Sequence, residues 1–154
     1  MVSEGDIAPD FQLPTGDGTT LELSKLKGSP VVLYFYPKDD TSGCTKEALA
    51  FTEHAKDFSK LGAGVIGVSP DSVASHEKFK AKHGLKVTLA SDTEKQVCET
   101  YGVWVEKSMY GRKYMGVERS TFLIDDEGRV ARAWRKVKVP GHAEAVLDAL
   151  KQIQ

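Results

Sequence analysis

Cys44 stands where an apolar run gives way to a polar loop and then to a helical pattern. Residues 31–51 read VVLYFYPKDDTSGCTKEALAF. A cysteine attacks electrophiles as its thiolate, and an ordinary free thiol, with a pKa of about 8.5, is only a few per cent ionised at neutral pH. A reactive cysteine at this position therefore requires surroundings that stabilise negative charge.

The first stabilising element is the start of a helix. If Thr41 is the N-cap, Cys44 occupies the third helical position, close to unpaired backbone N–H groups and the positive end of the helix dipole. A helix terminus contributes about 0.3–1 kcal/mol and at best about 2 kcal/mol, whereas raising the ionised fraction of a thiol from about 3% to about 90% at pH 7 requires about 3.4 kcal/mol. The sequence therefore predicts a second positive group beside Cys44.

Arg119 is the best candidate for that group. It lies in VERSTFLID, where a charged loop enters an apolar strand, so its guanidinium can be fixed at the ligand-binding end of a sheet. Arginine stays protonated and offers a fork of donors. Periodicity alone does not favour it over Arg112 or Lys113, and these two alternatives stay open.

The elements that must position these residues alternate between strand and helix patterns. The predicted strands are 31–36, 64–69 and 87–91, the predicted helices are 44–61, 72–84 and 92–102, and a turn at 126–128 joins strands 120–125 and 130–137 before a last helix at 141–153. Asp92 and Gly102 are the expected caps of the third helix. This order predicts an α/β fold, a mixed sheet flanked by helices, in one domain over residues 1–154.

Composition excludes several classes of function. The 21 basic and 22 acidic residues give a net charge of -1 without blocks of one sign, so no pattern favours nucleic acid or an anionic membrane. The start, MVSEGDIAPDFQLP, lacks the features of a signal peptide, and no apolar run approaches the ~18 residues of a membrane span. We expect a cytoplasmic protein, in which two cysteines indicate reactivity or burial more than a structural disulfide.

The motif Pro37-x-x-x-Thr41-x-x-Cys44 resembles the active-site signature of the peroxiredoxins. YFYPKDDTSGCTKEALAF and GVWVEKSMYGRKYMGVERSTFLID are similar to the peroxiredoxin Q subfamily, also called bacterioferritin comigratory protein. The similarity runs over nearly the whole chain. It implies a thioredoxin-like fold and thiol-dependent reduction of hydrogen peroxide and organic hydroperoxides, without a cofactor.

The resemblance also implies roles for five residues. Cys44 matches the peroxidatic cysteine, Thr41 the hydroxyl that hydrogen-bonds thiolate and peroxide, and Pro37 the residue that shields the pocket. Arg119 matches the active-site arginine of the family. Glu47, one turn after the cysteine, matches a recurrent acidic position there.

The chain departs from the family pattern in two places. Ser42 stands where many members carry a proline, a change that leaves the turn workable. Members with a resolving cysteine usually place it five residues after the peroxidatic one or in the next helix, and here those places hold Leu49 and a cysteine-free segment at 72–84. We therefore expect an enzyme of the one-cysteine type.

Cys98 is the other cysteine. It shares an apolar helix face with Val97 and Tyr101, which predicts a small buried core residue. The alternative is an atypical resolving cysteine, which requires Cα atoms within ~7 Å and unwinding of the first turn of the 44–61 helix.

Without an internal resolving cysteine, a sulfenic acid at Cys44 must be reduced by an external thiol, such as glutathione, a thioredoxin-like protein or another small thiol. The expected assembly is a monomer or a weak homodimer. A peroxide sensor that passes its oxidation to a partner protein is the second hypothesis, and a binding module with an unreactive cysteine is the third.

Several other patterns carry weaker signals. GAGVIG at 62–67 satisfies the dinucleotide-binding G-x-G-x-x-G pattern but precedes a strand, so it predicts a helix end and a close backbone approach. Residues 103–116 either rim a pocket or partner surface or form a loop folded over the sheet edge. Alternation at 135–139 predicts a strand with solvated lysines.

The histidines show no zinc-ligand spacing, and neither cysteine belongs to a C-x-x-C pair. The sequence therefore predicts no metal site and histidines at the surface or at helix caps. The four are His54, His76, His83 and His142.

Overall fold

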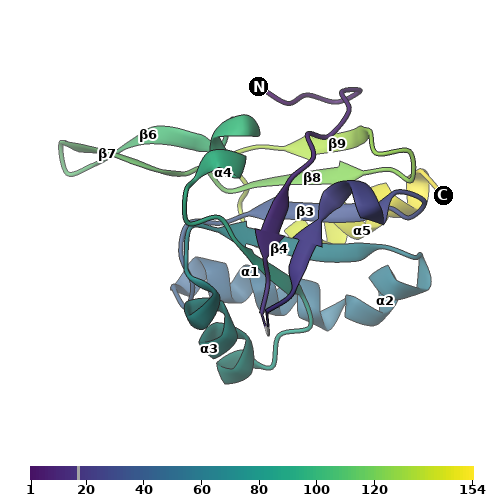
Figure 1. The fold of residues 1–154 in the computed structure, drawn as a ribbon, viewed down its shortest axis with the longest axis horizontal. Coiled ribbons are helices and arrows are strands. Elements are labelled where there is room, and N and C mark those ends of the chain that lie inside the picture. Colours follow the sequence, from purple (N-terminus) through teal and green to yellow (C-terminus); the bar gives the residue numbers. More distant parts are fainter. Residues whose placement is uncertain (17) are drawn as a thin grey trace.

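The computed structural model describes residues 1–16 and 18–154, and its centre is a five-stranded mixed sheet in the order β5-β4-β3-β8-β9 (Figure 1). The strands are β3 (Val31–Phe35), β4 (Gly64–Ser69), β5 (Thr88–Ser91), β8 (Ser120–Ile124) and β9 (Val130–Trp134). Strands β3, β4 and β5 run parallel, while β8 and β9 pair antiparallel. The sequence predicted each of these strands, and β4 has the predicted bounds.

Five α-helices within the described residues accompany the sheet. They are α1 (Ser42–Glu53), α2 (Ala55–Lys60), α3 (Val73–His83), α4 (Gln96–Thr100) and α5 (His142–Gln152). The single helix predicted over 44–61 is two helices, because the backbone at His54 (φ -98°, ψ 12°) leaves helical values.

Helix α4 is shorter than the predicted 92–102 segment, because Lys95 has a left-handed backbone (φ 61°) directly before it. Asp92 lies outside the helix but still binds backbone N–H groups at its start. Its carboxylate accepts hydrogen bonds from the N–H groups of Val97 at 3.4 Å and Cys98 at 2.8 Å.

The two faces of the sheet bury two separate clusters. Along β3, Leu33 and Phe35 point to one face and Val32 and Tyr34 to the other, as the period of two in a strand requires. The first face packs against the N-terminal segment and α4, and the second packs against α1, α2, α3 and α5. β3 is buried on both faces, which explains its unbroken apolar sequence.

Two hairpins and a 3₁₀ helix complete the described fold: β1 (Gln12–Pro14) with β2 (Thr20–Glu22), η1 (Leu23–Leu26), and β6 (Trp104–Met109) with β7 (Arg112–Val117). The open alternatives for 103–116 did not include a hairpin. This segment forms most of a β6–β7 ribbon that extends away from the body (Figure 1). Tyr110 and Gly111 turn the ribbon with positive φ values of 52° and 78°.

The strand predicted at 135–139 is absent from the structure. β9 ends at Trp134, and Lys136 has a left-handed backbone (φ 50°) that interrupts the extended chain. Val137 N–H instead donates to Arg119 C=O at 3.0 Å, so this segment supports the chain just before β8.

The glycine pattern at 62–67 has the structural role predicted for it. Gly62 (φ 76°) follows the end of α2, and Gly67 lies against the ring of Tyr34, where a Cβ atom would come within 2.6 Å of that ring. The Tyr34 ring also stacks on Phe51 of α1 at 4.8 Å between centroids. Gly67 therefore lets the ring lie flat between the sheet and the helix that carries Cys44.

Within residues 1–16 and 18–154, no helix has the length and apolar character that crossing a bilayer demands.

Candidate active site

Cys44 lies at the start of α1, just beyond the carboxyl end of β3. Thr41 is the N-cap with an extended backbone (φ -89°, ψ 157°), and Cys44 is the third residue of the helix, both as predicted. The thiol is 1% exposed. Its position gives it the backbone N–H groups and the dipole of a helix N-terminus.

Arg119 provides the second positive group. Its Nη2 donates to Cys44 Sγ at 3.3 Å, and its Nη1 donates to Glu47 Oε1 at 2.6 Å. The register of the sheet explains the contact: Ser120 of β8 pairs with Phe35 at the carboxyl end of β3, which sets Arg119 beside the start of α1.

The two alternatives to Arg119 lie elsewhere. Arg112 and Lys113 are exposed residues of the β6–β7 ribbon, and Lys113 Nζ lies 3.6 Å from Glu106. The structure therefore selects Arg119 from the three basic residues.

Glu47 completes a chain of three hydrogen-bonded side chains. Its carboxyl group is 1% exposed, and burial raises its pKa to about 7 against the opposing effect of Arg119. For Arg119, burial opposes the charge, but Glu47 and Cys44 together raise its pKa. Glu47 Oε2 has no hydrogen-bond partner among the described residues, so the carboxyl group is held by Arg119 alone.

The raised pKa of Glu47 predicts a specific pH dependence of stability. Between pH 4.5 and about 7 the unfolded chain ionises this carboxyl group while the folded chain keeps its proton, so the free energy of unfolding falls as pH rises. The full loss is about 3 kcal/mol above pH 7. Denaturant unfolding at pH 4.5 and pH 8 should show that the wild type loses about this much relative to Glu47→Gln.

Glu53→Gln is the matched control, because Glu53 is an exposed carboxylate at the end of the same helix. We expect the stability difference between this variant and the wild type to stay constant over the same range. A Glu47→Gln difference that is equally flat would contradict the buried titration.

Thr41 and Pro37 lie in the loop that leads to Cys44. Thr41 Oγ1 donates to Lys38 C=O at 2.9 Å, and no hydrogen bond within the described chain joins it to Cys44 Sγ. Pro37 is half-buried at the bend after β3. The structure thus joins Cys44, Arg119 and Glu47 through hydrogen bonds and sets Thr41 three residues before the thiol.

Cys98 lies on the other side of the sheet. It belongs to the cluster packed around Leu33 and Phe35, whereas Cys44 belongs to the cluster around Val32 and Tyr34. Its side chain is fully buried, and burial, followed by hydrogen bonding and charge from Asp92, raises the pKa of its thiol. Both cysteines are free.

The prediction of surface or capping histidines is wrong for two of the four. His142 is buried at the start of α5, where its Nε2 lies 2.7 Å from the Thr121 hydroxyl and burial lowers its pKa to about 4. His76 is buried on α3 against Asp39. Both rings point inward because their helices press these faces onto the sheet, which the residue type does not reveal.

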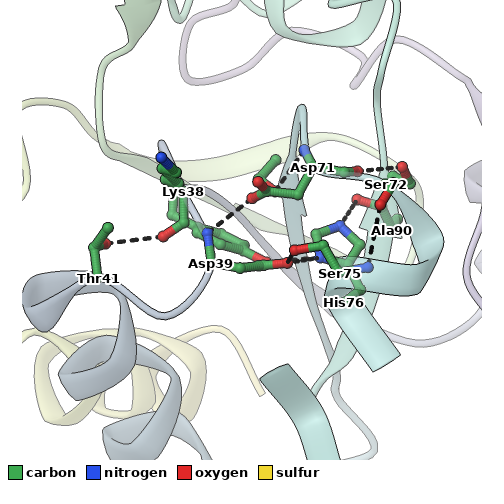
Figure 2. Close-up of polar contacts among 11 residues, drawn as sticks. Lys38, Asp39, Thr41, Asp71, Ser72, Ser75, His76 and Ala90 are labelled. Atoms are coloured by element: carbon green, nitrogen blue, oxygen red, sulfur yellow. Dashed lines mark hydrogen bonds and ion pairs between the residues drawn. The ribbon is translucent and has the colours of Figure 1, made fainter. Parts of the chain in front are cut away.

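Asp39, in the loop before Cys44, is the centre of a hydrogen-bond network that the sequence did not predict (Figure 2). The Asp39 carboxylate accepts from Tyr36 Oη at 2.5 Å, Ser75 Oγ at 2.7 Å and His76 Nδ1 at 2.7 Å. Asp39 N–H donates to Asp71 Oδ2 at 2.8 Å. Although burial opposes ionisation, these side-chain bonds lower the pKa of Asp39.

Asp39, Asp71 and His76 form the one group in the described parts of the chain with three ligand atoms close enough for a metal ion, within 4.8 Å of one another. Their polar atoms already form hydrogen bonds with one another and with Ser69, whose Oγ donates to Asp71 Oδ2 at 2.6 Å. A cation would have to displace these bonds. The donor set is therefore that of a satisfied hydrogen-bond network, and it fits a metal poorly.

The fold and these contacts together define a class of protein. Cys44 is a buried thiol at a helix N-terminus, and it contacts a guanidinium at the carboxyl edge of a mixed sheet. This arrangement is typical of a thiol-based redox protein. Residues 5–133 match the model of the AhpC/TSA family.

Relatives define that class more closely. The chain is 52% identical to a putative peroxiredoxin of Coxiella burnetii over 149 residues, covering 97% of this chain and 99% of that one. It is 50% identical to the peroxiredoxin Bcp of Bacillus subtilis, covering 97% and 95%. The structure of the Xanthomonas campestris bacterioferritin comigratory protein aligns with a TM-score of 0.93 at 46% identity, covering 100% and 97%.

The chain belongs to the AhpC/TSA family and, within it, to the peroxiredoxins of the Bcp or peroxiredoxin Q type. It has the thioredoxin-like fold of these proteins, as the resemblance to the peroxiredoxins implied. Its activity is that of a thiol peroxidase, with a peroxide as substrate and a thiol as reductant.

Proposed function

We propose that Cys44 is the peroxidatic nucleophile of a one-cysteine thiol peroxidase, which an external thiol recycles. The observation that carries this proposal is the 3.3 Å contact between Arg119 Nη2 and Cys44 Sγ, in a chain whose second cysteine is buried on the opposite face of the sheet. Cys44 has a guanidinium partner, whereas among the described residues the charged groups that act on Cys98 are the carboxylates Asp92 and Glu99.

In the first step the Cys44 thiolate attacks one oxygen of the hydroperoxide. A sulfur–oxygen bond forms, the O–O bond breaks, and the leaving oxygen takes a proton, so thiol and ROOH become sulfenic acid and ROH. Arg119 and the N–H groups at the start of α1 stabilise the developing negative charge. Glu47 fixes the guanidinium for this task through its bond to Nη1.

Thr41 and Pro37 shape the space in which the peroxide binds. Thr41 gives its hydroxyl proton to Lys38 C=O, which leaves the oxygen free to accept a hydrogen bond from the O–H of the hydroperoxide. Pro37, at the bend after β3, shields the pocket from water. These two residues orient the peroxide rather than react with it.

In the second step an external thiol attacks the sulfenic sulfur, forms a mixed disulfide and releases water, and a second thiol restores Cys44. Cys98 takes no part, because it is a core residue of α4 with a raised pKa. Peroxiredoxin Q of X. campestris has structures with each of two cysteines replaced by serine. If the spacing between those two cysteines is counted from Cys44, the second position in this chain is Lys80 of α3, which is not a cysteine.

The substrates we propose are hydrogen peroxide and organic hydroperoxides, and the X. campestris relative was solved in a study of its alkyl peroxide reduction. The reductant is glutathione, a thioredoxin or another small thiol. Such thiols are maintained in a reducing compartment, which favours the cytoplasm, and we propose a monomer or a weak homodimer.

Intact mass of the non-reduced protein after one equivalent of hydrogen peroxide tests the proposal. We expect the mass of one or more added oxygens on Cys44, and turnover once a thiol donor is supplied. Loss of two hydrogens would instead identify a disulfide between Cys44 and Cys98. Oxidation of Cys44 without turnover by any donor would favour a peroxide sensor that oxidises a partner protein.

A further inference from the structure

The loop between β3 and α1 is clamped to α3 through two consecutive aspartates. Asp39 accepts hydrogen bonds from Ser75 and His76 of α3, and Asp40 accepts from Lys82 Nζ at 2.6 Å and His83 Nε2 at 2.8 Å. Asp40 also has a left-handed backbone (φ 58°), a conformation that aspartate adopts more readily than most residues because its short side chain can hydrogen-bond locally. The loop conformation therefore depends on the contacts that α3 makes with it.

His76 holds the centre of this clamp, and both of its ring nitrogens face acceptors. Nδ1 lies 2.7 Å from the Asp39 carboxylate, and Nε2 lies 3.1 Å from the carbonyl oxygen of Ala90 on β5 (Figure 2). The His76 ring therefore connects the Asp39 side chain to the backbone of β5. The ring is 1% exposed and thus bridges Asp39 to the sheet without help from solvent.

These contacts between the loop and α3 are connected to the N-terminal end of α1, where Cys44 lies. Asp39 lies two residues before Thr41, and Lys38 supplies the carbonyl that receives the Thr41 hydroxyl (Figure 2). Thr41 C=O in turn accepts the first hydrogen bond of α1, from Thr45 N–H at 2.9 Å. A shift of Asp39 would therefore move Thr41 and the N–H groups around Cys44 together.

We propose that His76 is a positioning residue for the thiol: acting through Asp39, it fixes the loop that sets Thr41 and the start of α1 around Cys44. This inference rests on the proposed role of Cys44 as the nucleophile. His76 itself touches neither the thiol nor the peroxide. Its effect on the reaction is carried by the backbone of residues 38–41.

His76→Gln is the first test, because glutamine can replace at most one of the two ring hydrogen bonds. We expect the rate constant of Cys44 with hydrogen peroxide to fall roughly 10- to 100-fold, the range expected when reacting groups are displaced by about 1 Å. Alkylation of Cys44 by iodoacetamide should slow less than the peroxide reaction, because it needs the thiolate but not the Thr41 hydroxyl that orients the peroxide. Amide exchange of residues 38–45 should also become faster.

His54→Gln is the matched control. His54 bonds Glu144 at 3.0 Å and Asp57 at 3.3 Å at the break between α1 and α2, outside the clamp. We expect its peroxide rate to stay within about twofold of the wild type. Asp39→Asn should reproduce the His76→Gln defect, and the double variant should lose little more than either single variant, because both break one connection.

A merely structural His76 would lower the melting temperature but leave the peroxide rate unchanged below it, and that result would overturn the inference. Equal slowing of the peroxide and iodoacetamide reactions would overturn it as well. Should His76→Gln fail to fold, Ser75→Ala removes a single donor to Asp39 and should give a smaller loss of peroxide rate, again larger than the loss of alkylation rate. A wild-type protein in which Cys44 does not react with peroxide would instead refute the proposed function.

Discussion

Cys44→Ser is expected to reduce peroxide consumption by at least about a thousandfold, to the background rate of the thiol donor alone. A serine hydroxyl is almost fully protonated at neutral pH and cannot supply the electron pair that breaks the O–O bond, even with Arg119 Nη2 in place. The measurement is hydrogen peroxide loss with a defined thiol donor. The variant should also show no oxygen gain by intact mass at one equivalent of peroxide.

Cys98→Ala is the control for this result. Cys98 is buried in the cluster on the opposite face of the sheet, so alanine removes its thiol without creating a buried polar group. We expect turnover within about twofold of the wild type and a modest stability loss of about 1 kcal/mol. If Cys98→Ala stops turnover while Cys44 still gains oxygen, Cys98 is the resolving cysteine and the one-cysteine proposal is wrong.

Local rules were sufficient for the elements that carry Cys44. Strand β4 and the N-cap at Thr41 follow from short-range patterns, namely an apolar run between glycine and serine and a polar residue before a helical stripe. Arg119 required more, since its charge alone does not separate it from Arg112. The antiparallel pairing of β8 with β3 decides the matter, and that pairing joins residues far apart in the sequence.

The clamp on the active-site loop could not be predicted because its partners are distant. Asp39 and His76 are 37 positions apart, and neither lies in a motif that indicates a partner. His76 follows Ser72, the N-cap of α3, by four residues and precedes the buried Phe79 by three, which was the available signal that it faces the core. Tertiary packing, rather than residue type, buries it.

Arg119→Ala is expected to slow the reaction of Cys44 with hydrogen peroxide roughly 10²- to 10³-fold, the usual cost of removing one preorganised donor to developing negative charge. The guanidinium contacts both Cys44 Sγ and Glu47 Oε1, so its loss also leaves a buried carboxyl group without its only hydrogen-bond partner among the described residues. Stopped-flow oxidation of the reduced protein measures the rate constant directly.

Arg119→Lys separates the charge from the geometry. A lysine keeps the positive charge but lacks the planar fork that reaches the thiol and Glu47 at once, so we expect a rate between those of the wild type and Arg119→Ala. Arg112→Ala, on the exposed ribbon, should leave the rate unchanged. A wild-type peroxide rate in Arg119→Ala would show that the helix N-terminus suffices to activate Cys44, and the role proposed for Arg119 would have to be abandoned.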